Sequence, residues 1–271
     1  MKFKYLIIAF SIIIVVIIFA TALFPLVILG SESTVNSRFI SLPPLILMAL
    51  LLAGMGIYFF LNYRLLSLLE REDWPALAYY LEQEIIVKGR YNSRKVRLLV
   101  SSYMVISDYQ SIQNLEEKAL LAKPSVVEKN VLVFGAARVL SGHHKEAAIF
   151  FRNYLDKCDP KDKQWARWFL GFSQLLGGSF RLAEPEFSSL AVSCDDAVIT
   201  GLSAYFLNSS LAKHSLKPAE CRAAAENGRN RVINVIKTAE NWKKELDRKK
   251  AEVHIAVISK YVNEAEKWLF K

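Results

Sequence analysis

The sequence has few of the residues and motifs that form reactive sites. Three cysteines occur among its 271 residues, and they are Cys158, Cys194 and Cys221. An odd number cannot all pair within one chain, so no disulfide framework is expected, and no CxxC spacing indicates zinc. The glycine-rich phosphate loop, the GxGxxG turn and the GxSxG elbow are also missing. We therefore expect no enzymatic activity, no catalytic residue, no metal site and no cofactor.

Charge is almost absent from residues 1–63, although the whole chain carries a net charge of +9. The charged positions in this region are Lys2, Lys4, Glu32 and Arg38. The remaining residues hold 32 basic and 25 acidic side chains, so the excess of hydrophobic residues lies in the N-terminal part. This asymmetry excludes a wholly soluble enzyme and predicts a membrane region followed by a soluble domain.

Two uncharged apolar stretches in this region are long enough to cross a bilayer. Residues 5–30 would extend about 39 Å as a helix, against a hydrocarbon core about 30 Å thick. Residues 42–63 begin with a proline pair suited to a first helical turn and end in aromatic residues. We expect a transmembrane hairpin, joined by the polar segment 31–41. A cleaved signal peptide is the alternative for the first stretch, but its apolar run is longer than a signal peptide has.

Basic residues near the ends of the two stretches predict the orientation. Lys2 and Lys4 precede the first stretch, whereas Arg38 is alone in the joining segment. Arg64 and Arg71 follow the second stretch. The segment 85–107, which we call the acid-free segment, adds five basic residues and no acidic one: Lys88, Arg90, Arg94, Lys95 and Arg97. Because basic residues concentrate on the cytoplasmic side, we expect an integral membrane protein with both termini and the soluble domain in the cytoplasm. The five residues are candidate contacts for anionic lipid headgroups; alternatively they only set the orientation.

Residues 64–271 contain a pattern that recurs about every 35 residues. A glycine followed by an Ala-x3-Phe pair occurs twice, 36 positions apart: Gly135, Ala147 and Phe151, then Gly171, Ala183 and Phe187. Each cycle has the pattern of a helix of about 14 residues, a tight turn and a second helix of similar length, with the turns at 107–109, 142–144 and 177–180. We therefore predict an all-α fold, with an α-solenoid of helix-turn-helix repeats after the hairpin. The repeats are expected at about 93–126, 128–161 and 164–197, with a degenerate cycle at 198–225 and terminal capping helices at 230–270.

At these positions the domain resembles the tetratricopeptide repeat family, in its membrane-anchored bacterial form with two N-terminal spans. The best matches to the family pattern are Leu170, Gly171, Gly178, Phe180, Ala183 and Phe187. The first repeat departs from it, since Val100 and Ile112 replace the glycine and the alanine. The resemblance implies a packing pattern without catalytic residues, in which the first helix of each repeat lines a concave face that binds a partner protein.

Counting from the matched glycines gives a candidate partner groove, and its residues are Arg97, Leu132, Ala136, Trp165, Trp168 and Phe172. This apolar and aromatic set favours an amphipathic helix or an extended apolar peptide as the ligand. The alternative is that the aromatic residues pack against the next repeat or the terminal helices.

The sequence thus predicts a non-catalytic, membrane-anchored scaffold that binds a partner protein at the cytoplasmic membrane face. A structural subunit of a membrane complex, contacting its partners through the hairpin, is the alternative. Nucleic acid is not expected as a partner, because acidic and basic residues alternate along the C-terminal segments. The sequence indicates neither the oligomeric state nor the identity of the partner.

Overall fold

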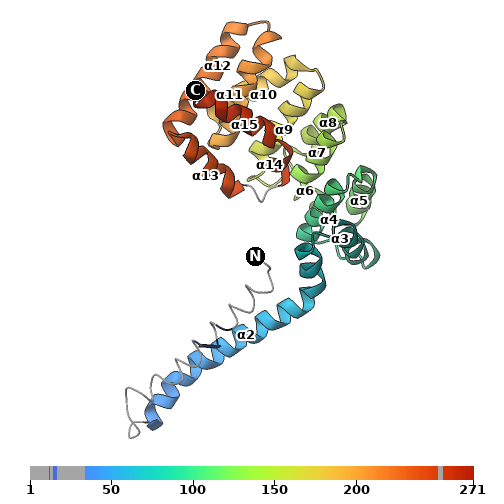
Figure 1. Cartoon of the computed structure of the whole chain (residues 1–271). Helices are drawn as coiled ribbons and strands as arrows, with labels where there is room; N and C mark the ends of the chain where they lie inside the picture. The colour runs from blue at the N-terminus through green and yellow to red at the C-terminus, as the bar shows by residue number, and fades with distance from the viewer. Residues whose placement is uncertain (1–11, 13–14, 17–33, 250–252) are drawn as a thin grey trace. The chain divides into compact units, whose positions relative to one another are not determined.

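The computed structural model describes residues 34–249 and 253–271, together with residues 12, 15 and 16. These residues are helical or lie in turns and linkers, with no strand among them, as Figure 1 shows. The all-α prediction is therefore confirmed for this part of the chain. The protein divides into two compact units, residues 1–77 and residues 78–271, and each is described by itself.

The first unit is dominated by α2 (Thr34–Glu70), one continuous helix of 37 residues. It contains the whole second predicted span, 42–63, and continues to Glu70. Within the described residues, Leu50–Glu70 is the one stretch long and apolar enough to cross a membrane, and none of its most apolar window is buried. The first predicted span, 5–30, lies outside the described residues apart from positions 12, 15 and 16. One candidate span is thus present, and a hairpin of two spans is not established.

The start of α2 differs from the prediction. The proline pair at Pro43 and Pro44 was expected in the first helical turn, but α2 begins at Thr34, so residues 34–41 of the predicted connection are helical. A proline removes its own N–H donor and disfavours helical dihedrals in the preceding residue, which makes a helix start the common position for it. The preference of proline for a helix start amounts to about 3 kcal/mol, so residues before Pro43 can still be helical.

The second unit begins inside α3 (Trp74–Glu82), which is extended by the π-helical turn η1 (Gln83–Val87). The helices that follow are α4 (Ser93–Val105), α5 (Tyr109–Ala122), α6 (Pro124–Glu128), α7 (Val131–Leu140), α8 (His144–Tyr154), α9 (Lys163–Leu176) and α10 (Phe180–Ser193). The chain ends with α11 (Ala197–Ser209), the 3-10 turn η2 (Leu211–Lys213), α12 (Pro218–Ile236), α13 (Ala239–Lys249), α14 (Val253–Val257) and α15 (Ser259–Leu269). Successive helices from α7 to α12 pack against one another in chain order.

One turn geometry recurs along the chain at nearly constant spacing. A residue with positive φ follows a helix at Glu72, Ser107, Gly142 and Gly178, which are 35, 35 and 36 positions apart. In each turn the next N–H donates to the carbonyl five residues back, for example His143 N to Arg138 O at 3.1 Å. This bond is the mark of a Schellman helix end, where glycine takes the left-handed conformation without strain. The predicted helix-turn-helix period is therefore present in the backbone.

Small residues on the first helix of a pair let an aromatic ring of the second helix approach. A Cβ added to Gly135 would lie 2.1 Å from Phe151 Cζ, and one added to Gly171 would lie 3.4 Å from Phe187 Cζ. The glycine and the phenylalanine are 16 residues apart in both pairs. Gly135 thus leaves no room for a side chain, whereas the space at Gly171 is only slightly too small for a methyl group. The spacing of glycine and phenylalanine is the one that the sequence predicted.

The equivalent second-helix position in the preceding pair holds a buried acid. Glu116, which is 6% exposed, occupies the place of the phenylalanine and accepts a hydrogen bond from Arg138 of α7 at 2.5 Å. Burial raises the pKa of Glu116, and the Arg138 guanidinium opposes that rise. The ion pair satisfies a carboxylate that would otherwise be buried alone, and it links α5 to α7.

Candidate functional site

The aromatic residues of the predicted partner groove lie in the protein core. Trp168 is 0% exposed, and Trp165 and Phe172 are also buried. The Trp165 ring lies 5.0 Å from the His254 ring of α14, and the Phe172 ring lies 5.2 Å from the Tyr261 ring of α15. Figure 1 shows these two C-terminal helices beside α9. The chain's own terminal helices therefore cover this face, which is the alternative that the sequence left open.

The other predicted groove residues do not join the aromatic set into one open surface. Leu132 and Ala136 of α7 are buried, and α14 packs on α7. Arg97 of α4 is exposed and donates instead to Asn130 Oδ1 at 3.2 Å and to the Lys129 carbonyl at 3.3 Å. The six residues share a predicted helix face, but the structure does not leave that face open to a partner.

Three of the predicted headgroup contacts converge on an acid that the sequence analysis did not single out. Lys88, Arg90 and Lys95 surround the Glu84 carboxylate, with Lys95 Nζ at 3.0 Å and Arg90 Nη1 at 3.7 Å. Hydrogen bonds from Lys88 and then from Lys95 lower the pKa of Glu84 to about 2. Glu84 lies in η1, directly before the acid-free segment, and its carboxylate contacts three basic side chains of that segment. Its charge compensates much of the basic run.

Acid titration should reveal this cluster. Because the folded pKa of Glu84, about 2, is below its ordinary value of 4.5, the ion pairs stabilise the fold fully above about pH 4.5 and are lost as the pH falls toward 2. The Glu84→Gln variant should melt lower than the wild type at neutral pH and lose less stability between pH 5 and pH 3. Melting temperatures of the full chain across this range measure the difference, with the exposed Glu240→Gln as control. If the melting temperatures of the wild type and Glu84→Gln change with pH in parallel, the stabilising role of the Glu84 ion pairs is contradicted.

The linker between η1 and α4 borders two adjoining pockets, which together we call the basic pocket. Gly89, whose φ of +64° is left-handed, turns the chain into this linker. The first pocket, of about 390 Å³, is lined by Gly89, Arg90, Tyr91, Asn92, Ala122 and Lys123. The second, of about 330 Å³, is lined by Tyr91, Asn92, Ser93, Arg94, Lys123, Ser125, Val126 and Lys129. Since three lining residues are common to both, the two pockets form one hollow between the linker and the α5–α6 junction.

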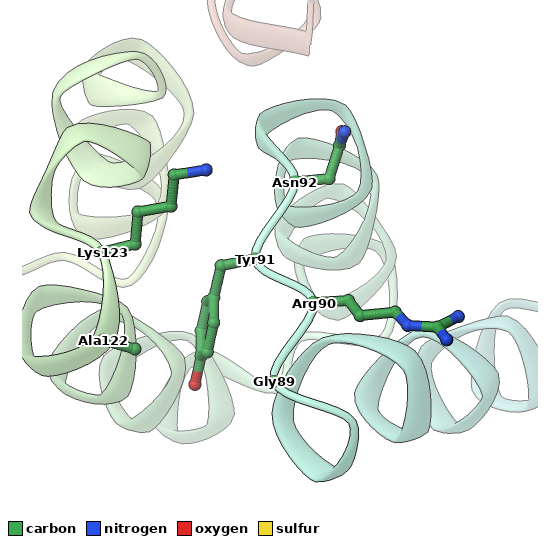
Figure 2. A pocket seen from close by; sticks show the side chains of 6 residues that line it. All are labelled: Gly89, Arg90, Tyr91, Asn92, Ala122 and Lys123. Atoms are coloured by element: carbon green, nitrogen blue, oxygen red, sulfur yellow. The ribbon is translucent and has the colours of Figure 1, made fainter.

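Figure 2 shows how side chains line the first pocket. The Tyr91 ring lies beside Ala122, and the Lys123 side chain extends on the side of the pocket where Asn92 lies. Arg90 points away from Lys123, and its Nη1 lies 3.7 Å from the Glu84 carboxylate. The cation that belongs to this pocket is therefore Lys123, and the second pocket adds Arg94 and Lys129.

No acidic side chain lines the basic pocket. Within residues 34–249 and 253–271, no carboxylate forms an ion pair with Arg94, Lys123 or Lys129, whereas Lys88 and Lys95 are engaged by Glu84. Asn92 uses its Oδ1 to accept from the Arg94 N–H at 2.9 Å, which orients its amide group at the start of α4. The basic pocket thus combines unneutralised positive charge with concave shape, and we take it as the candidate functional site.

The described residues offer no comparable site for metal or thiol chemistry. Among them, no three His, Cys, Asp or Glu side chains lie close enough together to hold a metal ion. The three cysteines are buried and unpaired, and burial raises the pKa of the Cys221 thiol to about 11. These thiols are therefore protonated at neutral pH and are poor nucleophiles.

Fold and site together define an all-helical protein of helix-turn-helix pairs, with one exposed apolar helix and a basic pocket. Residues 111–271 match the model of a family described as "Uncharacterised Treponema protein". A protein of Treponema pallidum (strain Nichols), described as "Uncharacterized protein", is 31% identical in an alignment of 216 positions that covers 77% of this chain and 69% of that protein. The chain belongs to this Treponema family. No tetratricopeptide family is among the matches, and no solved structure matches.

Proposed function

We propose that this protein is a non-catalytic, membrane-anchored scaffold of tetratricopeptide-like repeats that binds a partner protein at the cytoplasmic face of the bacterial inner membrane. One combination of features carries the proposal: the unburied apolar stretch Leu50–Glu70 and a helix-turn-helix period of 35 to 36 residues occur in the same chain. Repeats of this kind stack into extended surfaces that serve as binding platforms. In this proposal residues 5–30 form a second span.

The anchor is supported by the exposure of large apolar side chains on α2. Phe60 is 82% exposed and Leu61 is 71% exposed, and both lie in the candidate span. Exposed large apolar side chains along one helix are unfavourable in water and indicate contact with lipid or protein. A bilayer would remove it from water along the whole stretch.

We call the face formed by Trp165, Trp168 and Phe172 the aromatic face. The partner surface is proposed to lie away from it, because α14 and α15 cover it. Exposed leucine and isoleucine side chains occur on the second helices of three successive pairs, at Leu121, Ile149 and Leu182. An amphipathic helix or an apolar peptide is the ligand chemistry that such side chains favour.

The alternative function is a structural subunit that contacts its partners through the membrane segment, and the exposed apolar face of α2 is the observation that favours it. Affinity capture after cross-linking in the native bacterium separates the two. The full chain should be found in the membrane fraction, and a chain that begins at Glu70 should leave it but retain the same cross-linked partners. Loss of those partners from the shorter chain would favour the alternative, and a full chain that fractionates as a soluble protein would refute both.

A further inference from the structure

We propose that the basic pocket binds a phosphate group carried by a small ligand, either the headgroup of an anionic lipid or a soluble phosphate ester. This inference does not rest on the scaffold function. It begins from an imbalance of charge: Arg94, Lys123 and Lys129 line one hollow, and no carboxylate lines it with them.

The neighbouring Glu84 cluster differs from the basic pocket, because its basic residues are paired with a carboxylate. Lys88, Arg90 and Lys95 all lie within 4 Å of one buried carboxylate. The pocket cations Arg94, Lys123 and Lys129 form no such ion pair within the described chain. Holding like charges around one hollow is unfavourable by itself, and an anion in the hollow would reverse the sign of that interaction.

The chemistry of the lining favours phosphate over a smaller anion. Arg94 comes from α4, whereas Lys123 and Lys129 lie at either end of the short helix α6. Cations that approach from separate elements suit a tetrahedral group with several charged oxygens, and an arginine can contact two of these oxygens at once. The hydroxyl of Ser125 and the amide of Asn92 are neutral donors on the same lining.

The size and the apolar wall of the hollow fit a headgroup-sized molecule. The two pockets, of about 390 and 330 Å³, fall at the small end of the range for ligand sites, which is about 300 to 1,000 Å³. The Tyr91 ring and Ala122 form a wall on which the carbon part of an ester could lie, as Figure 2 shows. Glycerol phosphate, free or as part of a lipid, has this combination of one phosphate and a short carbon chain.

Calorimetric titration of the full chain in a neutral detergent tests the proposal with two probes, sn-glycerol 3-phosphate and dihexanoyl-phosphatidylglycerol. At least one of them should bind saturably at one site. The double variant Arg94→Gln/Lys123→Gln should weaken that binding tenfold or more. The control Lys118→Gln/Arg152→Gln removes the same charge from exposed positions outside the pocket and should change the affinity by less than twofold.

The two probes also identify the source of the phosphate. Binding of the lipid alone assigns a membrane headgroup, binding of glycerol phosphate alone assigns a soluble ester, and binding of both shows that the phosphate and glycerol are sufficient. Failure of both probes to bind saturably, or an equal loss of affinity in the two double variants, would overturn the proposal.

Folding of the variants is checked by their melting temperatures in the same detergent. If the double variant melts well below the wild type, the affinity of the single variant Lys129→Gln is measured instead. This variant removes one exposed pocket cation and leaves Arg94 and Lys123 in place. A loss of affinity of about threefold in this variant supports the pocket, and an unchanged affinity overturns it.

Discussion

Replacing Gly135 with alanine should destabilise the protein by about 1 to 3 kcal/mol, the usual cost of overpacking a core. The added Cβ would lie 2.1 Å from Phe151 Cζ and 2.6 Å from both Cε atoms of that ring, which is fully buried. Alanine gains about 1 kcal/mol over glycine in helix propensity, but a contact this short requires a helix or the ring to move. The clash should therefore outweigh the propensity gain.

Gly171→Ala is the matched control, because Gly171 occupies the same place in the next helix pair. Its added Cβ would lie 3.2 Å from Glu186 Cβ and 3.4 Å from Phe187 Cζ, a contact that a shift of a few tenths of an ångström relieves. The propensity gain should roughly offset this strain, so the melting temperature should hardly change.

A second substitution tests the cause of the effect at Gly135. In the double variant Gly135→Ala/Phe151→Leu, the loss of stability should be smaller than the sum of the two single losses, because leucine leaves room for the new methyl group. Thermal melting of the full chain, monitored by circular dichroism, gives the stability of the wild type, the two single variants and the double variant. Equal melting temperatures for Gly135→Ala and Gly171→Ala would contradict the packing described for the two pairs.

Trp168→Ala should lower the stability by about 3 to 5 kcal/mol, the range for removing a large aromatic side chain from a core. The Trp168 ring is stacked 5.0 Å from Phe172, and it lies 6.0 Å from both Phe187 and Phe206. Its removal would leave a cavity where α9, α10 and α11 meet. The same substitution at Leu121, which is 90% exposed, should change the stability by less than about 0.5 kcal/mol.

Trp168→Phe adds a finer test of the same site. Trp168 Nε1 is buried and has no hydrogen-bond partner among the described residues, so phenylalanine removes an unsatisfied donor while it keeps a ring in place. This variant should lose much less stability than Trp168→Ala. A Trp168→Ala protein that melts like the wild type would show that the ring is not part of the core, and the aromatic face would again be a candidate groove.

The helices and the spacing of their turns could be predicted from the sequence because their signals are local. Gly142 and Gly178 have positive φ, and the turns lie where the glycine pattern placed them. Even the turn at Ser107, which lacks glycine, was predicted from its place in the period, and Asp108 supports it by accepting from the Ser111 N–H at 3.1 Å. A short-range signal repeated at constant spacing fixes both the type and the position of these elements.

The environment of the aromatic face could not be predicted in the same way. The spacing of Trp165, Trp168 and Phe172 assigns them to one side of a helix, but it does not indicate what covers that side. The cover comes from α14 and α15, which have no fixed offset from α9 in the repeat. Periodicity therefore identified the residues correctly as apolar and helical and left open whether they bind a partner or a later part of the chain.

The sequence did not predict the basic pocket, although it named two of its residues, Arg90 and Arg94, as candidate headgroup contacts. Arg94 belongs to the acid-free segment, but Lys123 and Lys129 come from the α5–α6 junction some 30 residues later. The proline at the start of α6 predicts a new helix there. That this helix lies close to the segment of Arg94 depends on the tertiary fold and has no local signal in the sequence. The same holds for Glu84, which lies inside the π-helical turn η1, because its contacts with Arg90 and Lys95 depend on the tertiary fold.

The cover of α9 by α15 makes the order of synthesis important for this protein. Phe172 leaves the ribosome 89 residues before Tyr261, the ring that packs on it. At translation rates of about 5 to 20 residues per second, this interval lasts roughly 4 to 18 seconds. During that time the aromatic face has no cover from its own chain, and a chaperone or a neighbouring nascent chain could occupy it. Helices α14 and α15 therefore complete the core around α9, and folding of this region finishes only after they emerge.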